Sequence, residues 1–236
     1  MLNPVAAIKH GPCFAIVEEG AIVEDGAIVD DGASLVARWA TPEDRAYAAR
    51  RRRSGASLGA LAALRGLLFA ATERTDWRIE RAPFGKPSIV DGRGRSGPAI
   101  SLSHTKGLIA VAVAAEGAIG IDVEHHRTRD FVALAEQAFG PAEQAEVAVH
   151  GAEAFYRIWT LREAMAKATG EGLALAIHRR DLAENIVTGI VHRRERSMRR
   201  WHLLHTLPRP DCGMAFAWFG GGAAPPHRVD LASACP

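Results

Sequence analysis

The sequence is poor in cysteine and lacks long hydrophobic runs. Its three cysteines, Cys13, Cys212 and Cys235, are scattered and have no CxxC spacing. An odd, scattered set indicates neither a disulfide framework nor a zinc site, and it is typical of a reducing compartment. We find no run of about 18 apolar residues, which a membrane span needs, and no apolar signal-peptide core in residues 1–14. We therefore expect a cytoplasmic protein with no membrane partner.

Lysine is also scarce, because the chain uses arginine almost everywhere a cation occurs. The net charge is only +2, which does not by itself indicate a nucleic-acid binder. Arginine clusters lie at 50–53, 179–180 and 193–200, but acids interrupt them and no aromatic stacking pattern accompanies them. A lysine in such a chain is a candidate functional residue, since its compact ammonium charge differs from the planar guanidinium of arginine. The four lysines are Lys9, Lys86, Lys106 and Lys167.

The 236 residues, 48% hydrophobic and 24% charged, are enough for one large domain or two small lobes. Thr41 and Pro42 predict a helix start that runs toward 50–53, and a second helix is predicted over 57–72. Extended segments are predicted at 99–103, 108–114 and 117–124, helices at 131–139 and 153–169, and strands near 201–207 and 213–219. Helices and strands recur in a similar order on either side of residue 120. This pattern predicts an α+β fold of two similar lobes in a pseudo-twofold arrangement, 1–117 and 118–236, each a small antiparallel sheet with helices.

A short repeat with glycines at 20, 26 and 32 leaves two interpretations open. A six-residue period is typical of the β-solenoid of hexapeptide acyltransferases, but it stops after three units. The alternative is a short strand pair with turns at Asp25–Gly26 and Asp31–Gly32. The helical middle of the chain favours the strand pair.

Two carboxylates alternate with aliphatic residues in the segment from Gly117 to Glu124. On a strand, Ile119 and Ile121 would enter the core while Asp122 and Glu124 share the opposite face. Like charges so placed repel unless a cation lies between them, and Mg²⁺ prefers such oxygens. A solvent-facing acidic strand end is the alternative.

A second group lies on the predicted helix 153–169. Trp159, Glu163 and Lys167 follow at i, i+4 and i+8, so they share one stripe. A stripe that contains tryptophan is expected to be at least partly buried, and a buried carboxylate and ammonium need partners. An aromatic core residue beside an ordinary surface ion pair is the alternative.

The third group is Ser101-Leu-Ser103-His104, just before a glycine turn. A Ser–His nucleophilic pair is conceivable, but we find neither a third group to orient the histidine nor a nucleophile elbow. A polar loop that contacts a ligand is the favoured interpretation.

Four segments in this order resemble the 4′-phosphopantetheinyl transferase superfamily, in its larger two-lobed, surfactin-synthetase-activating type. They are Phe84-Gly-Lys-Pro87, Leu102-Ser-His104, Gly120-Ile-Asp-Val-Glu124, and Trp159-Thr-Leu-Arg-Glu-Ala164 followed by Lys167. The resemblance implies Mg²⁺-dependent transfer (with Mn²⁺ as an alternative ion) of phosphopantetheine from coenzyme A to a carrier-protein serine. It also implies a monomer whose active site lies in the cleft between the lobes.

The resemblance assigns roles residue by residue. Asp122, Glu124 and Glu163 would hold the metal, and Glu163 would help to remove the serine proton. Lys167 would bind the transferring phosphate. The nucleotide end of coenzyme A would be held by Lys86, Ser103, His104 and an arginine of the first helices, Arg53 or Arg65.

The sequence departs from the family pattern at Arg162, where the family usually has lysine. From the pattern alone, Arg162→Lys is expected to leave activity equal or higher. This departure also supports the alternative function, a non-catalytic relative that binds coenzyme A or a carrier protein. The carrier protein and pathway are not readable from these motifs.

Overall fold

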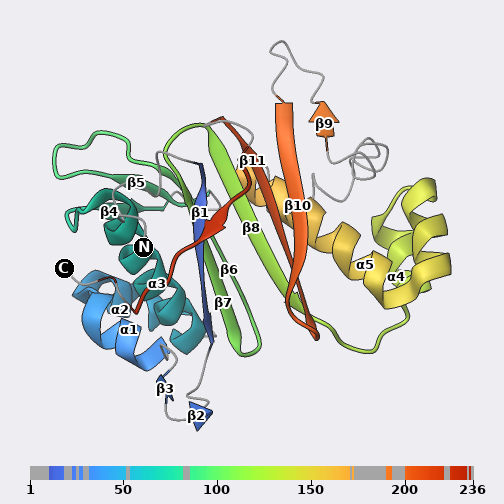
Figure 1. Ribbon diagram of the computed structural model, residues 1–236, viewed down its shortest axis with the longest axis horizontal. Coiled ribbons are helices and arrows are strands. Elements are labelled where there is room, and N and C mark those ends of the chain that lie inside the picture. Colours follow the sequence, from blue (N-terminus) through green and yellow to red (C-terminus); the bar gives the residue numbers. More distant parts are fainter. Residues whose placement is uncertain are drawn as a thin grey trace.

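The computed structural model describes residues 11–18, 23–24, 27–28, 32–51, 54–81, 86–170, 172, 190–192, 200–220, 224–232 and 234. These residues form an α+β fold in which two four-stranded sheets pack face to face and helices cover both outer faces (Figure 1). The first sheet has the strand order β12 (His227–Arg228), β1 (Cys13–Glu18), β7 (Leu108–Ala114), β6 (Ala99–Thr105). The second has the order β8 (Ala118–His125), β11 (Cys212–Phe219), β10 (Arg200–Arg209), β9 (Ile190–His192).

Helices cover the outer face of each sheet. The first sheet is covered by α3 (Ser54–Thr72), with α1 (Gly32–Trp39) and α2 (Pro42–Ala48) beside it, and the second by α5 (Pro141–Thr169). The helix α4 (Phe131–Ala138) packs on α5. Two hairpins complete the described elements: β2 (Val23–Glu24) with β3 (Ala27–Ile28), and β4 (Arg78–Glu80) with β5 (Ser88–Val90).

Both sheets repeat one topology. In each sheet, one strand is followed along the chain by a long helix and then by two more strands. The last of the three strands in chain order lies between the other two in the sheet. The units are β1–α3–β6–β7 and β8–α5–β10–β11. The doubled pattern of the sequence predicted a recurrence of helices and strands, but it did not predict β1, the first strand of the first unit. The division at residue 117 and the twofold relation of the lobes stay predictions, and β12 pairs parallel with β1 of the first sheet.

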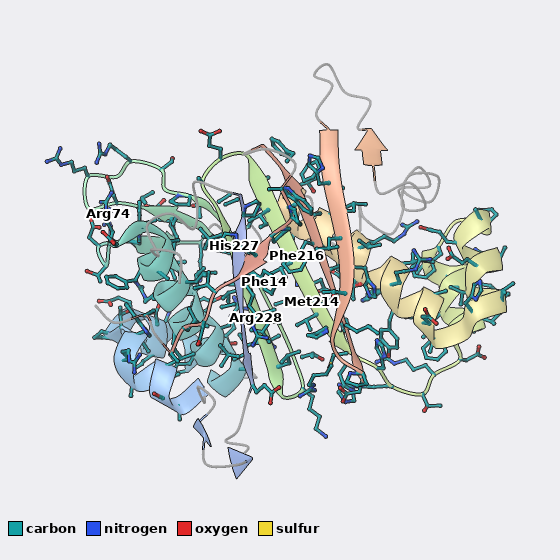
Figure 2. All side chains as sticks on the ribbon, in the orientation of Figure 1. Phe14, Arg74, Met214, Phe216, His227 and Arg228 are labelled. Atoms are coloured by element: carbon teal, nitrogen blue, oxygen red, sulfur yellow. The ribbon has the colours of Figure 1, made fainter. Side chains whose placement is uncertain are left out.

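Side-chain alternation builds the core between the sheets. In β1, Cys13 faces α3, whereas Phe14 points to the second sheet and packs against Phe216 with ring centroids 4.8 Å apart (Figure 2). Met214 lies in the same layer. Every residue of β7 is buried, because helices cover one face of that strand and the second sheet the other.

The helix α3 is long and almost entirely apolar. From the sequence we found no apolar run of about 18 residues, but by length and composition alone Gly55–Thr72 could cross a membrane; 61% of that segment is buried inside the fold. An apolar helix is what a sheet face needs as its cover, since the sheet presents an apolar surface.

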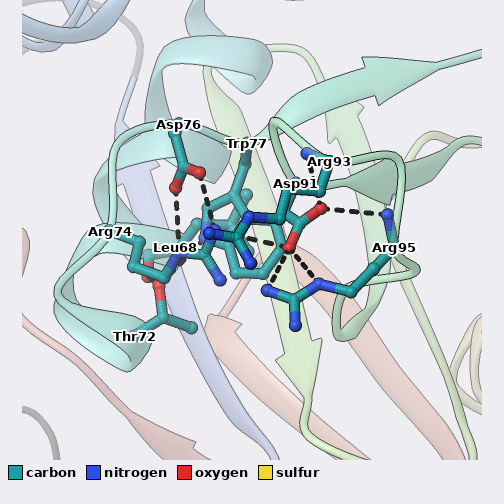
Figure 3. Close-up of polar contacts among 8 residues, drawn as sticks. All are labelled: Leu68, Thr72, Arg74, Asp76, Trp77, Asp91, Arg93 and Arg95. Atoms are coloured by element: carbon teal, nitrogen blue, oxygen red, sulfur yellow. Dashed lines mark hydrogen bonds and ion pairs between the residues drawn. The ribbon is translucent and has the colours of Figure 1, made fainter.

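The chain between α3 and β6 is held by a polar turn (Figure 3). The buried Asp91 carboxylate accepts backbone N–H bonds from Arg93 and Arg95, both at 2.9 Å. Trp77 donates its indole N–H to Thr72 at 3.0 Å, and the Arg74 guanidinium lies 4.4 Å from the ring centroid. These contacts fasten the β4–β5 hairpin to the end of α3.

Several local predictions are confirmed. Thr41 caps α2 by accepting the N–H of Asp44 at 3.2 Å, and α5 ends at Thr169 as predicted, followed by Gly170 in the left-handed conformation. The β2–β3 pair is confirmed, while Gly32 begins a helix, so the solenoid interpretation is wrong there. Glycines 20 and 26 lie outside the described residues.

Two helix boundaries differ from the prediction. The helix α2 ends at Ala48, before the arginine run, with Ala49 as its C-cap. The helix α5 begins at Pro141, not at 153, and has non-helical backbone at Gly151 (φ 57°, ψ −129°). This break interrupts the hydrophobic period, so only the second half was readable from the sequence.

Candidate functional site

The candidate site lies where β6 of the first sheet meets β8 of the second. Three hydroxyls of β6, at every second position, accept backbone N–H bonds from β8. Ser101 accepts from Ile121 at 3.0 Å, Ser103 from Val123 at 3.3 Å, and Thr105 from His125 at 3.1 Å. We call these three bonds the hydroxyl ladder. It satisfies edge N–H groups of β8, which on that side have no strand partner in the part of the chain that the structure describes.

The strand β8 has the predicted alternation. Ile119 and Ile121 are fully buried between the sheets, and Gly120 and Asp122 face α5. A β-carbon on Gly120 would lie 1.9 Å from the Ala164 carbonyl oxygen, so only glycine allows α5 to pack this closely. This close packing brings the side chains of α5 onto the carboxylates of β8.

Asp122 is the centre of the site. Its side chain is 5% exposed, and its Oδ1 accepts bonds from Ser103 Oγ at 2.9 Å and from Lys167 Nζ at 2.7 Å. Lys167 Nζ also donates to Ser103 Oγ at 2.8 Å. Asp122 Oδ2 is buried and has no hydrogen-bond partner among the described residues. One carboxylate oxygen is therefore fixed by two donors, whereas the other accepts no hydrogen bond from the described residues.

Two further carboxylates lie close enough to Asp122 to respond to its charge. Burial first, and then repulsion by Asp122, raises the pKa of Glu163 to about 7, and Lys167 partly offsets this rise. The same two causes raise the pKa of Glu124, against the opposing effect of Lys167 and of a hydrogen bond with Trp159. The predicted acidic group is thus brought together around one lysine.

Whether this group fits a metal can be judged from its donors. Within the described ranges, no group of three or more His, Cys, Asp or Glu side chains is already arranged to hold an ion. However, hard carboxylate oxygens are what Mg²⁺ prefers, and Asp122 Oδ2 has no partner among the described residues. Burial first, and then repulsion by Asp122, raises the pKa values of Glu163 and Glu124, so a cation beside them would be favourable. The donor set therefore fits a divalent cation, and the metal assignment stays a prediction.

A cavity of about 250 Å³ adjoins this group. Residues of both halves of the sequence line it, namely Lys86, Pro87, Ile100, Ser101, Leu102, Glu163, Ala166, Lys167, Gly170 and Gly172. A second hollow, of about 350 Å³, borders Glu124 and Trp159 on the α4 side.

Lys86 is at the edge of the cavity but binds protein groups. Its ammonium donates to the carbonyls of Ile119 at 2.8 Å and Ala168 at 3.1 Å. Burial lowers the pKa of Lys86 to about 8. The residue therefore ties the segment before β5 to the start of β8 and the last turn of α5. Its expected contact with the nucleotide remains a prediction.

The other predicted nucleotide ligands are placed less fully. His104 follows Ser103 on β6 and is half-buried. Arg53, Phe84 and Gly85 lie outside the described residues. Arg65 is paired with the buried Asp44 (Nε to Oδ2, 2.5 Å) and donates to the Trp77 carbonyl, so the contacts of Arg65 are structural.

Arg162 has its own fitted partner, which the sequence did not indicate. It is 2% exposed, and its Nε donates to Glu143 Oε1 at 3.0 Å while Nη2 bonds to Glu143 Oε2. Its guanidinium carbon lies 5.4 Å from the Phe139 ring centroid. A lysine cannot reproduce a bidentate contact and a ring contact together. We therefore expect Arg162→Lys to lower stability, while the expectation that this change leaves activity equal or higher stays a prediction.

Sequence reasoning missed two relationships. Ser103 was taken as a ligand contact, although its described partners are Asp122, Lys167 and β8. The spacing of Ser101, Ser103 and Thr105 at alternate positions was a signal that could have indicated a shared face. Nothing in the pattern indicated Glu143, because it lies 19 residues before Arg162.

The fold and the site define an α+β protein with one buried aspartate, two partly buried glutamates and a lysine beside a cavity. The family model of the 4′-phosphopantetheinyl transferase superfamily matches residues 118–216. The 4′-phosphopantetheinyl transferase HetI of Nostoc sp. is 32% identical over 180 residues, which cover 74% of this chain and 74% of HetI. The 4′-phosphopantetheinyl transferases AcpT of Salmonella typhi and Salmonella typhimurium are each 40% identical over 91 residues, 36% of this chain and 46% of AcpT.

This chain belongs to the 4′-phosphopantetheinyl transferase superfamily. The match to HetI extends well beyond the residues that the family model covers, whereas the AcpT matches span less than half of those relatives.

Proposed function

We propose that this protein transfers the 4′-phosphopantetheine group of coenzyme A to a serine of an apo acyl or peptidyl carrier protein. The serine oxygen forms a bond to the phosphorus that bears pantetheine, the phosphoanhydride breaks, and 3′,5′-ADP leaves. The observation that carries the proposal is the arrangement of Asp122, Lys167 and Glu163 beside a cavity, in a chain of this family.

The chain's own residues supply charge and proton transfer. Lys167 lines the cavity and presents an ammonium that would neutralise charge on the transferring phosphate. Glu163, whose pKa is raised to about 7, can exchange a proton near neutral pH. A base with such a pKa is suited to accept the proton of the carrier serine.

Mg²⁺, with Mn²⁺ as an alternative, is the proposed cofactor. Asp122, Glu124 and Glu163 would hold it, and when bound it would neutralise charge on the pyrophosphate. The unpartnered Asp122 Oδ2 and the raised pKa values of the two glutamates support this donor set.

We further propose the larger, two-lobed type of this family, acting as a cytoplasmic monomer with its site between the lobes 1–117 and 118–236. The recurrent strand–helix–strand–strand topology and a cavity lined from both halves support this proposal. The resemblance assigned three residues to the nucleotide, and they lie on or near the boundary between the proposed lobes: Lys86, Ser103 and His104. Of these, Lys86 and His104 stay proposed nucleotide ligands.

The non-catalytic alternative loses its main support. That support was Arg162, and this side chain is accounted for by Glu143 and Phe139 inside the fold. Asp122, Glu124, Glu163 and Lys167 are all present.

The test is intact-mass spectrometry of apo carrier proteins incubated with the protein, coenzyme A and Mg²⁺, with and without chelator. A chelator-sensitive gain of one phosphopantetheine is expected, and it should vanish in Asp122→Ala while that variant stays folded. Measurable coenzyme A binding without any gain on a panel of carriers would favour the non-catalytic alternative instead.

A further inference from the structure

One hydroxyl, that of Ser103, joins three elements of the site. From β6, its Oγ accepts the Val123 N–H of β8 and the Lys167 Nζ of α5, and it donates to Asp122 Oδ1. A serine hydroxyl has one proton to donate and two lone pairs that accept. All three capacities are therefore in use, and a nucleotide could bind this oxygen only if one of these bonds broke.

Burial and charge make these bonds significant. Ser103 is 6% exposed and Asp122 is 3% exposed, so water cannot replace a missing partner easily. Two of the three partners carry charge, and hydrogen bonds to charged groups are the stronger ones. The other members of the hydroxyl ladder, Ser101 and Thr105, accept from β8 in the same way.

We propose that the Ser103 hydroxyl is a positioning group, which fixes the Asp122 carboxylate and the Lys167 ammonium relative to each other, and that this oxygen does not itself bind the nucleotide. The inference rests on the proposed function in so far as Asp122 and Lys167 take part in the transfer. With Oδ1 fixed by two donors, the second oxygen of Asp122 has one defined direction. Partners that orient a ligand-binding carboxylate in this way typically affect affinity or activity 10- to 100-fold.

The test compares Ser103→Ala with Thr105→Val, a matched control that removes another hydroxyl of the ladder without touching Asp122 or Lys167. Three quantities are measured for each folded variant. They are the Kd of coenzyme A by calorimetry in EDTA, the Kd of Mn²⁺ by electron paramagnetic resonance, and kcat and KM for transfer by intact mass.

For Ser103→Ala we expect the Kd of coenzyme A in EDTA to stay within about twofold of wild type. The Kd of Mn²⁺ should weaken and kcat should fall, each by about tenfold or more, with little change in KM. Ser103→Thr keeps the hydroxyl and should recover most of kcat. Thr105→Val should leave all three quantities close to wild type.

Three outcomes would overturn the proposal. A coenzyme A affinity that falls tenfold in EDTA would make Ser103 a direct nucleotide contact. Unchanged Mn²⁺ affinity and kcat would remove its effect on Asp122, and an equal loss in Thr105→Val would assign the effect to the ladder as a whole. If wild type transfers nothing, the proposed function fails, but the coenzyme A and Mn²⁺ titrations still decide the role of Ser103.

Discussion

Replacing Glu163 by glutamine should stabilise the protein while it abolishes transfer. In the folded chain, burial and Asp122 raise the pKa of Glu163 from 4.5 to about 7. Between these two pH values the folded form keeps a proton that the unfolded form has lost. Raising the pH therefore favours unfolding, and the full penalty is present above pH 7.

The size of this penalty follows from the shift. A change from 4.5 to about 7 corresponds to about 3 kcal/mol, and partial exposure of the carboxylate reduces the expected effect to about 2 kcal/mol. In urea unfolding with EDTA at pH 8, Glu163→Gln should be more stable than wild type by about this amount. At pH 5 most of the difference should be absent.

The exposed Glu153 on the same helix provides the control. Glu153→Gln should change the free energy of unfolding by less than about 0.5 kcal/mol at either pH. Equal stability of Glu163→Gln and wild type at pH 8 would refute the reasoning, because burial and the charge of Asp122 would then not penalise the ionised Glu163 carboxylate. A gain of stability with loss of transfer is expected of a residue kept for function.

Three further substitutions test the surroundings of the site. Arg162→Lys should lower the free energy of unfolding by about 2 kcal/mol, because buried Glu143 loses a bidentate partner. The control Arg157→Lys, at a partly exposed ion pair, should lower it by less than about 1 kcal/mol. Equal losses in the two variants would contradict this account. Lys86→Met should lower the free energy of unfolding in urea by about 2 kcal/mol, because the carbonyls of Ile119 and Ala168 lose their donor. Unchanged stability would show that these two hydrogen bonds are not needed for folding. Gly120→Ala should cost more than about 3 kcal/mol or prevent folding, since a β-carbon there would lie 1.9 Å from a carbonyl of α5; a stable, active variant would disprove the close packing.

The sequence predicted the parts of the site that depend on local periodicity. The alternation around Asp122 indicated its face correctly, and the spacing of Glu163 and Lys167 indicated a shared stripe. Both follow from the geometry of a single strand or helix, so one segment contains the whole signal.

Relationships between segments were not readable in this way. Ser103 meets Lys167 from 64 positions away, and Lys86 meets Ala168 from 82 positions away. Their side chains have the same composition whether they bind a nucleotide or a neighbouring strand. Only the packing of α5 on β8 decides which partner lies within reach, and that packing depends on Gly120.

The parallel pairing of β12 with β1 has a consequence for the order of events during synthesis. Residues 227–228 complete a sheet whose other strands lie between residues 13 and 114. During synthesis on the ribosome, the pairing of β12 with β1 can form only after the whole of the second unit has been translated. A domain normally closes its own sheet as it emerges, whereas here the first unit is finished last. A fusion or tag placed after β12 would therefore act on the folding of the first sheet, not only of the second.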